Sequence, residues 1–227
     1  MVLLATLACL APGLGADETD GVVADELAAD AFVSSATSDL GEMGATADSV
    51  TSVADASQLD PATADRCTPT AGDCVSCLTV TPEGGGSGTI LIEPEATPCG
   101  ATWTNADDVT FRWTLDESRF EGTYVPYEQG RTISLTGSRS RTVATTGRAD
   151  GDFTWTAQLA VTDLLFETDG QGGVVRYVVA MSYEGFGDSS WTLVAEGGGG
   201  VLEGTATNGD LDCIVSGTAV DPQITCG

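Results

Sequence analysis

The sequence predicts an all-β domain that follows an acidic N-terminal segment of low complexity. Across residues 89–226, apolar and polar side chains alternate in short runs, which is the period-two pattern of antiparallel strands with one buried face. Turns rich in Gly, Asp and Asn connect these runs almost end to end, and no helical pattern separates them. Residues 17–65, by contrast, hold 12 acidic residues, no Arg or Lys and one aromatic residue, Phe32. The β domain is therefore expected to span residues 66–227.

The first 16 residues resemble an export signal. They are mostly apolar and end in small residues just before Asp17, as in a secretory signal peptide that lacks its basic region. Cleavage after Ala16 is one interpretation. Lipidation at Cys9 is the alternative, because the Leu-Ala-Cys sequence there resembles the end of a bacterial lipobox. Both predict an exported protein, secreted, periplasmic or attached to the cell surface, with no membrane-spanning segment in the mature chain.

Residues 17–65 offer few large apolar side chains, so burial cannot offset the entropy lost when they become ordered. We expect this segment to form an acidic stalk that is disordered or weakly helical. The helical alternative depends on Val23, Leu27, Phe32 and Val33, which would share one face of a short helix.

Six cysteines remain once Cys9 is removed or lipidated, and an even number in a β-rich exported domain predicts three disulfides in an oxidising compartment. The spacing of Cys213 and Cys226 predicts a terminal hairpin in which the two lie opposite each other, within disulfide range. The alternative joins Cys226 to an N-terminal cysteine such as Cys99 across a barrel seam. A zinc site is the alternative to disulfides for the first four cysteines, which are Cys67, Cys74, Cys77 and Cys99.

Four rows of alternating residues give the clearest strands, and they lie at residues 109–115, 153–161, 175–183 and 191–195. The predicted turns lie at residues 116–118, 128–130, 137–138, 169–173, 197–200 and 208–209. The last of these, Asn208-Gly209, is the strongest signal because Asn-Gly favours a tight hairpin.

Short connections make consecutive strands neighbours, so we expect an antiparallel up-and-down meander. Twisted open sheets of more than about ten strands are unusual, so a meander this long is expected to close as a barrel or flattened barrel. A β-sandwich is the alternative. The predicted strands are mostly shorter than the roughly nine to eleven residues that cross a bilayer, which disfavours an outer-membrane barrel.

The net charge of −26, with no Lys and no His, limits the chemistry of the chain. Nucleic acid is excluded as a direct partner because phosphate binding needs clustered cations. Without His or Lys, the chain has no Ser-His-Asp or Cys-His nucleophile, no His metal ligand and no Schiff base. A carboxylate-based hydrolase is the enzymatic alternative that remains. We expect no enzyme and no cofactor.

Calcium is the cation that the loops are best suited to bind. Asn208, Asp210 and Asp212 carry oxygen-bearing side chains at alternate positions, and Ca²⁺ prefers such ligands. The same residue types are also favoured in hairpin turns for backbone reasons, so the sequence leaves both interpretations open.

The predicted function is that of an exported bacterial surface or periplasmic β-domain protein with a binding or structural role. No motif identifies its partner. The alternative is a lipocalin-like carrier of a small apolar ligand, in which Trp113, Trp155 and Trp191 line a cavity instead of filling the core.

Overall fold

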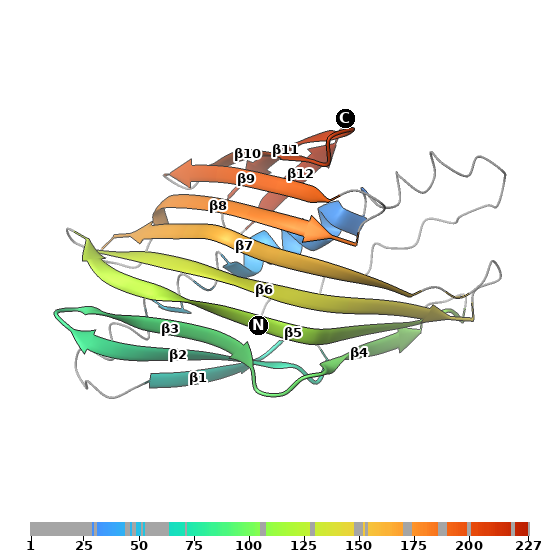
Figure 1. Ribbon diagram of the computed structural model, residues 1–227, viewed down its shortest axis with the longest axis horizontal. Helices are drawn as coiled ribbons and strands as arrows, with labels where there is room; N and C mark the ends of the chain where they lie inside the picture. Colours follow the sequence, from blue (N-terminus) through green and yellow to red (C-terminus); the bar gives the residue numbers. More distant parts are fainter. Residues whose placement is uncertain are drawn as a thin grey trace.

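In the part of the chain that it describes, the computed structural model contains one antiparallel sheet of 12 strands and one N-terminal helix (Figure 1). It describes residues 29, 31–43, 46, 49–50, 52, 64–70, 72–104, 108–127, 130–147, 152, 154–169, 174–185, 190–198, 201–218 and 221–226. The predicted signal segment, with Cys9 and Ala16, lies outside these residues. In the described part of the chain, no helix is long and apolar enough to cross a membrane.

The strands are β1 (Ala64–Pro69), β2 (Val75–Gly84), β3 (Ser87–Pro94), β4 (Cys99–Thr104), β5 (Thr110–Tyr127), β6 (Gly130–Thr146), β7 (Thr154–Thr168), β8 (Val174–Glu184), β9 (Trp191–Gly198), β10 (Val201–Thr207), β11 (Asp212–Gly217) and β12 (Pro222–Cys226). They follow one another across the sheet in chain order, except that β3 pairs with one half of β5 and β4 pairs with the other half. The predicted antiparallel meander is therefore confirmed.

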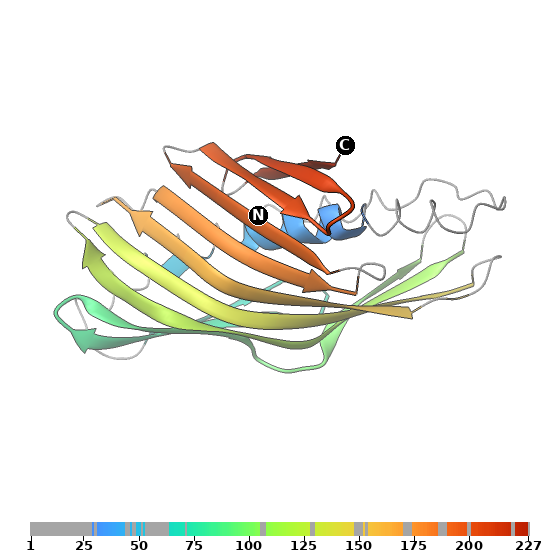
Figure 2. The same ribbon diagram turned by 45° about the horizontal axis from the view of Figure 1, so that its top comes forward.

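The predicted closure into a barrel is wrong, because the sheet is open. β1 pairs only with β2 and β12 only with β11, so the first and last strands do not meet. The sheet curves strongly, and the helix lies against its concave side (Figure 2). A second sheet, as in the sandwich alternative, is not present among the described residues. The helix explains both departures, since it buries the apolar side of the sheet without closure.

Two predicted turns lie inside long strands. Residues 116–118 form a β-bulge in β5, where the pairing with β6 shifts between Leu115 and Glu117. Gly137 lies in the middle of β6, opposite Phe120, and a Cβ atom there would lie 2.2 Å from the carbonyl oxygen of Arg119. Glycine is required at this position by the close approach of the neighbouring strand, not by a turn. As a result, β5 and β6 contain 18 and 17 residues, far more than the predicted strands.

The predicted Asn208-Gly209 turn links β10 to β11. The side-chain oxygen of Asn208 accepts hydrogen bonds from the backbone N–H groups of Asp210 and Leu211, at 3.0 and 2.9 Å. Gly209 has a φ of +95°, a conformation that favours glycine. This turn is built by backbone chemistry of the kind that makes Asn and Gly frequent in turns.

The helix includes residues 31–43, within the segment predicted to be a disordered or weakly helical stalk. Its buried residues recur at intervals of three or four, so they share one face. This face packs into the main hydrophobic core through Ala29, Phe32, Ala36, Leu40, Met43 and Val50. Of the predicted helix face, Phe32 is fully buried and Val33 packs at the edge of the core, while Val23 and Leu27 lie outside the described residues. The described helix is thus part of the folded domain.

Candidate functional site

The concave side of the sheet, called the inner face below, is the candidate functional site. Alternate residues of the strands point toward it, and those on β5 to β9 form a continuous apolar surface. Its buried members are Phe120, Tyr124, Ile133, Leu135, Ala157, Leu159, Val161, Leu164, Phe166, Tyr177, Val179, Met181, Tyr183, Trp191, Leu193 and Ala195. The helix covers this surface (Figures 1 and 2).

An aromatic cluster fixes one point of the helix on the inner face. The ring of Phe32 stacks on Trp191 with a centroid distance of 4.1 Å and an interplanar angle of 10°. The same ring meets Tyr183 edge-on, with centroids 5.3 Å apart. Tyr183 and Trp191 are directly opposed on β8 and β9. Phe32 thus occupies a position built by two neighbouring strands, and its contacts are of the geometry that aromatic pairs prefer.

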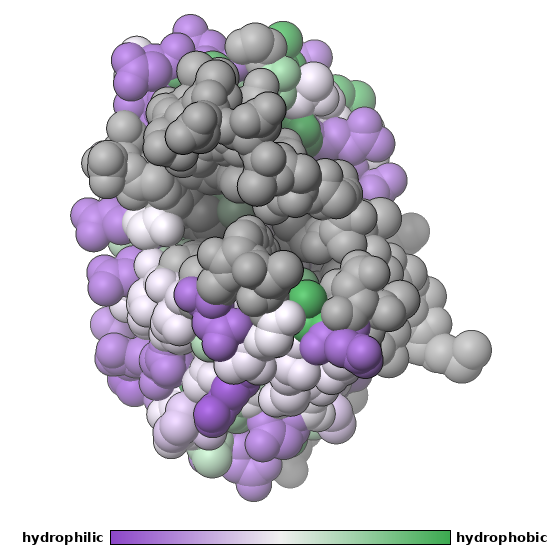
Figure 3. Space-filling view, turned by 90° about the vertical axis from the view of Figure 1, so that its right-hand side faces the viewer, coloured by the Kyte–Doolittle hydropathy of each residue, from purple (hydrophilic) through white to green (hydrophobic). Residues whose placement is uncertain are grey.

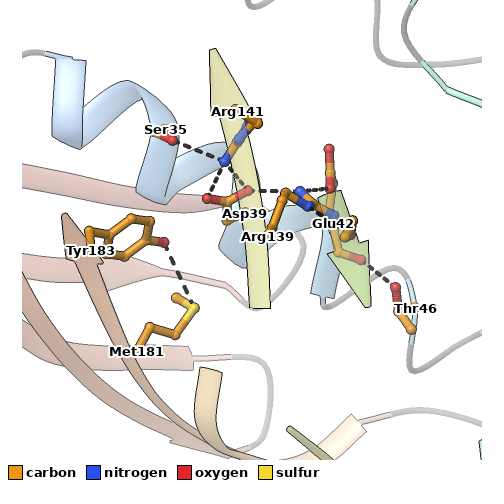
Figure 4. A network of polar contacts seen from close by, with 9 residues as sticks. Ser35, Asp39, Glu42, Thr46, Arg139, Arg141, Met181 and Tyr183 are labelled. Atoms are coloured by element: carbon orange, nitrogen blue, oxygen red, sulfur yellow. Dashed lines mark hydrogen bonds and ion pairs between the residues drawn. The ribbon is translucent and has the colours of Figure 1, made fainter. Parts of the chain in front are cut away.

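A charged network fixes a second point. Asp39, which is fully buried, bonds to Arg141 and accepts a hydrogen bond from Arg139 at 2.9 Å. Arg139 also bonds to Glu42 at 2.7 Å, and Ser35 accepts a hydrogen bond from Arg141 at 3.0 Å. Figure 4 shows these side chains converging from the helix and from β6. Two arginines of one strand are thus neutralised by two carboxylates of the helix.

The network perturbs the pKa values of its members. Burial raises the pKa of Asp39 above its ordinary value, and the charges of Arg141 and Arg139 oppose this only in part. Burial would also raise the pKa of Glu42, but the attraction of Arg139 holds that pKa below its ordinary value. Burial disfavours the charge of Arg139, yet Glu42 and Asp39 together raise its pKa. Arg139 therefore stays charged inside the protein, where it needs an anionic partner.

Two polar groups of the inner face have no hydrogen-bond partner. They are the hydroxyl of Tyr177 and the indole N–H of Trp191, whose side chains are almost completely buried. Burial raises the pKa values of Tyr177 and Tyr183 above that of a free tyrosine. The hydroxyl of Tyr183, in contrast, lies 3.8 Å from the sulfur of Met181 (Figure 4). Because native proteins leave few buried polar groups unsatisfied, the helix is an incomplete chemical match for this surface.

The predicted site residues are found in three separate places. The six cysteines form the disulfides Cys67–Cys77, Cys74–Cys99 and Cys213–Cys226. Cys213 and Cys226 are paired residues of β11 and β12, as the terminal-hairpin interpretation predicts. The structure thus uses the first four cysteines as disulfides and not as the ligands of a zinc site. Three disulfides indicate an oxidising environment.

The calcium candidates do not gather into a site of their own. The side-chain oxygen of Asn208 already accepts two backbone N–H groups in its turn, and Asp210 and Asp212 are exposed. Within the described residues, one group of acidic and cysteine side chains converges, namely Asp73, Cys74 and Cys99. Two of its three members are already joined as a disulfide, so this group is not a metal centre. Calcium binding at Asn208, Asp210 and Asp212 stays a prediction.

The three tryptophans proposed to line one cavity are not brought together. Trp191 belongs to the inner face, whereas Trp113 packs in a separate cluster around the Cys74–Cys99 disulfide. Beside Trp113 is an open pocket of about 160 Å³ that also contacts Asp73 and Arg112. The side chain of Trp155 lies outside the described residues. Of the residues that Figure 3 colours at one end of the protein, most are hydrophilic or of intermediate hydropathy, and a few are hydrophobic.

The sequence interpretation did not include Asp39, Arg139 and Arg141. A signal for them exists, since Ile133, Leu135, Arg139 and Arg141 all lie at odd positions of one strand. Two cations that continue an apolar row predict that charge is buried, and a buried cation requires a carboxylate partner.

Comparisons with known proteins give no relative of this chain. No family model matches it, and no curated protein or solved structure matches it significantly.

Proposed function

We propose that this chain is an exported, non-catalytic binding protein whose binding surface is the inner face of the sheet. One observation carries the proposal: an open sheet of curved strands presents a large aromatic and aliphatic surface that is covered by a single helix. The contacts between them join residues about 100 positions apart in the chain, such as Asp39 and Arg139. The helix thus acts as an internal occupant of the surface, and departure of the helix exposes the surface to a partner.

The compartment of the proposed function is extracytoplasmic. The three disulfides support this, because such bonds persist in oxidising environments. A periplasmic or cell-surface location fits the signal-like residues 1–16, with either cleavage after Ala16 or a lipid anchor on Cys9. Intact-mass measurement of the protein from its native host distinguishes the two forms, since an acylated Cys9 adds the mass of its lipid.

Hydrogen exchange on the full chain tests whether the helix is a separable occupant. We expect the amides of residues 31–43 to exchange through a local opening, with lower protection than the amides of β6 to β8. Phe32→Ala removes the ring that stacks on Trp191, and it should speed exchange in the helix by at least tenfold while β6 to β8 keep most of their protection.

Phe111→Ala is the matched control, because Phe111 stacks on Trp103 in β4 and does not contact the helix network. This variant should leave helix exchange unchanged. If the helix and the central strands exchange at one common rate, and Phe32→Ala accelerates both equally, the helix is a permanent part of the core and the proposed binding surface does not exist.

A further inference from the structure

We propose that the ligand of the inner face is an anionic amphiphile, a molecule with one acyl chain and an acidic head group. This inference rests on the proposed function, because the ligand needs the surface that the helix now covers. It goes further by naming the chemistry of the ligand, which can be deduced from what the helix supplies and from what it fails to supply.

The helix supplies an apolar line and an acidic group beside it. Phe32, Ala36, Leu40 and Met43 are all buried on one helical face, and at 1.5 Å per residue this line is about 16 Å long. Asp39 projects from the same segment onto Arg139 and Arg141 of β6. Asp39 lies within this line, next to Leu40 and one turn before Met43. An acyl chain with a carboxylate or phosphate head group supplies the same two kinds of group, an extended apolar body and an acid.

The two arginines make the acidic head group a requirement. With the helix in place, only small fractions of the Arg139 and Arg141 side chains, 17% and 12%, are exposed. When the helix leaves, both guanidinium groups lose Asp39, and Arg139 also loses Glu42. A neutral apolar ligand would then bury two uncompensated cations, which is strongly unfavourable. A carboxylate or phosphate matches the planar fork of donors that arginine presents.

The two unpartnered donors mark what the helix fails to supply. The indole N–H of Trp191 and the hydroxyl of Tyr177 are both buried on the inner face without an acceptor. The side chains of the helix that face this surface outside the charged network are apolar. An acyl lipid with an ester or hydroxyl oxygen provides an acceptor that the helix lacks. Trp191 lies opposite Tyr183 and Tyr177 lies six residues away on β8, so one such oxygen would satisfy one of the two donors.

Competition with the helix lowers the affinity that an experiment measures. The apparent dissociation constant is the intrinsic constant divided by the fraction of molecules whose inner face is uncovered. Variants that loosen the helix should therefore bind every ligand of this face more tightly. The ratio of two affinities measured on the same variant is unaffected by the helix, because both ligands compete with it equally.

The test compares oleate with oleyl alcohol, which have the same chain and differ in the charge of the head group. Both are titrated into the full chain at about 0.15 M salt, where the Debye length of about 8 Å screens the negative charge of the protein, and tryptophan fluorescence reports binding. We expect wild type to prefer oleate by at least tenfold, and Asp39→Asn to bind both probes more tightly.

The head-group site is tested by a variant designed to fold. The combination Asp39→Asn, Arg139→Gln and Arg141→Gln replaces the buried carboxylate and both of its arginine partners together, so neither kind of buried ion is left alone. Glu42, the fourth charged group of the network, loses Arg139 but is half exposed and stays solvated. Compared with Asp39→Asn alone, it should reduce the preference for oleate from at least tenfold to about onefold. Arg119→Gln is the control, since Arg119 is 56% exposed and pairs with Glu93 away from the network, and it should leave the preference unchanged.

Three results would overturn the inference. A preference for oleate that survives loss of Arg139 and Arg141 would place the acidic head group elsewhere. Equal affinity of wild type and Phe32→Ala would show that the probe does not compete with the helix. Absence of binding to Phe32→Ala, when hydrogen exchange shows that its helix opens, would exclude the amphiphile while the proposed binding surface stands.

Discussion

The margins and the centre of the sheet are held together by different means. At the margins, disulfides join β1 to β2 and β11 to β12, and a third bond ties Cys74, just before β2, to the start of β4. The central strands β6 to β9 contain no disulfide and gain their burial from the helix through side-chain contacts. Covalent bonds thus secure the strands that have only one neighbour, while non-covalent contacts with the helix cover the centre.

This difference predicts that single substitutions at the centre are more harmful than single substitutions at the margins. The largest effect is expected for Asp39→Ala, which leaves Arg139 and Arg141 buried without their main partner. Loss of one partner of a buried ion pair costs about 3–5 kcal/mol of unfolding free energy. Urea denaturation measures this loss, and the triple neutral variant described above should lose clearly less. Equal losses in the two variants would show that the charges themselves are unimportant.

The next effect belongs to the margin. Replacing Cys213 and Cys226 by serine removes a disulfide between residues 13 positions apart. In the loop-entropy model, a disulfide that closes a loop of this length stabilises the fold by about 3 kcal/mol. The loss should be confined to β11 and β12 if the margin is independent of the helix. Hydrogen exchange of residues 31–43 provides the control, and faster exchange there would contradict a division between margin and centre.

Alkaline pH should weaken the centre in particular. The folded pKa values of Tyr177 and Tyr183 are raised by burial, so above about pH 10 the unfolded chain loses two protons that the folded protein keeps. Stability should therefore fall as pH rises above about 10, by about 2.7 kcal/mol per pH unit for the two groups. Tyr177→Phe should halve this slope in urea denaturation measured at several pH values. A slope that Tyr177→Phe leaves unchanged would assign the alkaline loss to other groups.

The smallest effect is expected on the outer side of the sheet. Arg119→Gln removes an ion pair with Glu93 in which both side chains are about half exposed. Exposed ion pairs contribute roughly 0–1 kcal/mol, so the midpoint of urea unfolding should barely move. A loss comparable to that of Asp39→Ala would remove the contrast between inner and outer charges.

The sequence predicted the local features of the sheet better than its overall form. Alternation identified the inner rows of β7 and β8. The Asn208-Gly209 turn and the Cys213–Cys226 hairpin were predicted correctly because both features depend on residues close together in the chain. Gly137 was mistaken for a turn because a glycine breaks the pattern in the same way whether the chain reverses or a neighbouring strand approaches closely. Barrel closure could not be judged, since alternation reports which side is buried and not what buries it.

The candidate site was the least predictable part of the molecule. The helix has one aromatic residue and many small or polar ones, so its composition resembles that of a solvated segment. Its stability comes from partners such as Trp191, which lie far along the chain. Local propensity cannot register such contacts. Arg139 and Arg141 of β6 were the available signal, since buried cations at their positions require a carboxylate partner.

The order of elements along the chain has a consequence for how the protein matures. The helix precedes the sheet, so in a chain that emerges from its N-terminus the helix appears first and its partners last. Arg139 follows Asp39 by 100 residues, and Trp191 comes later still. Contacts of such long range form slowly, and the contact between Phe32 and Trp191 can form only after β9 has been made. If the strands pair before the helix docks, the inner face is briefly assembled but uncovered, and a ligand present at that moment could be enclosed during folding without any displacement of the helix.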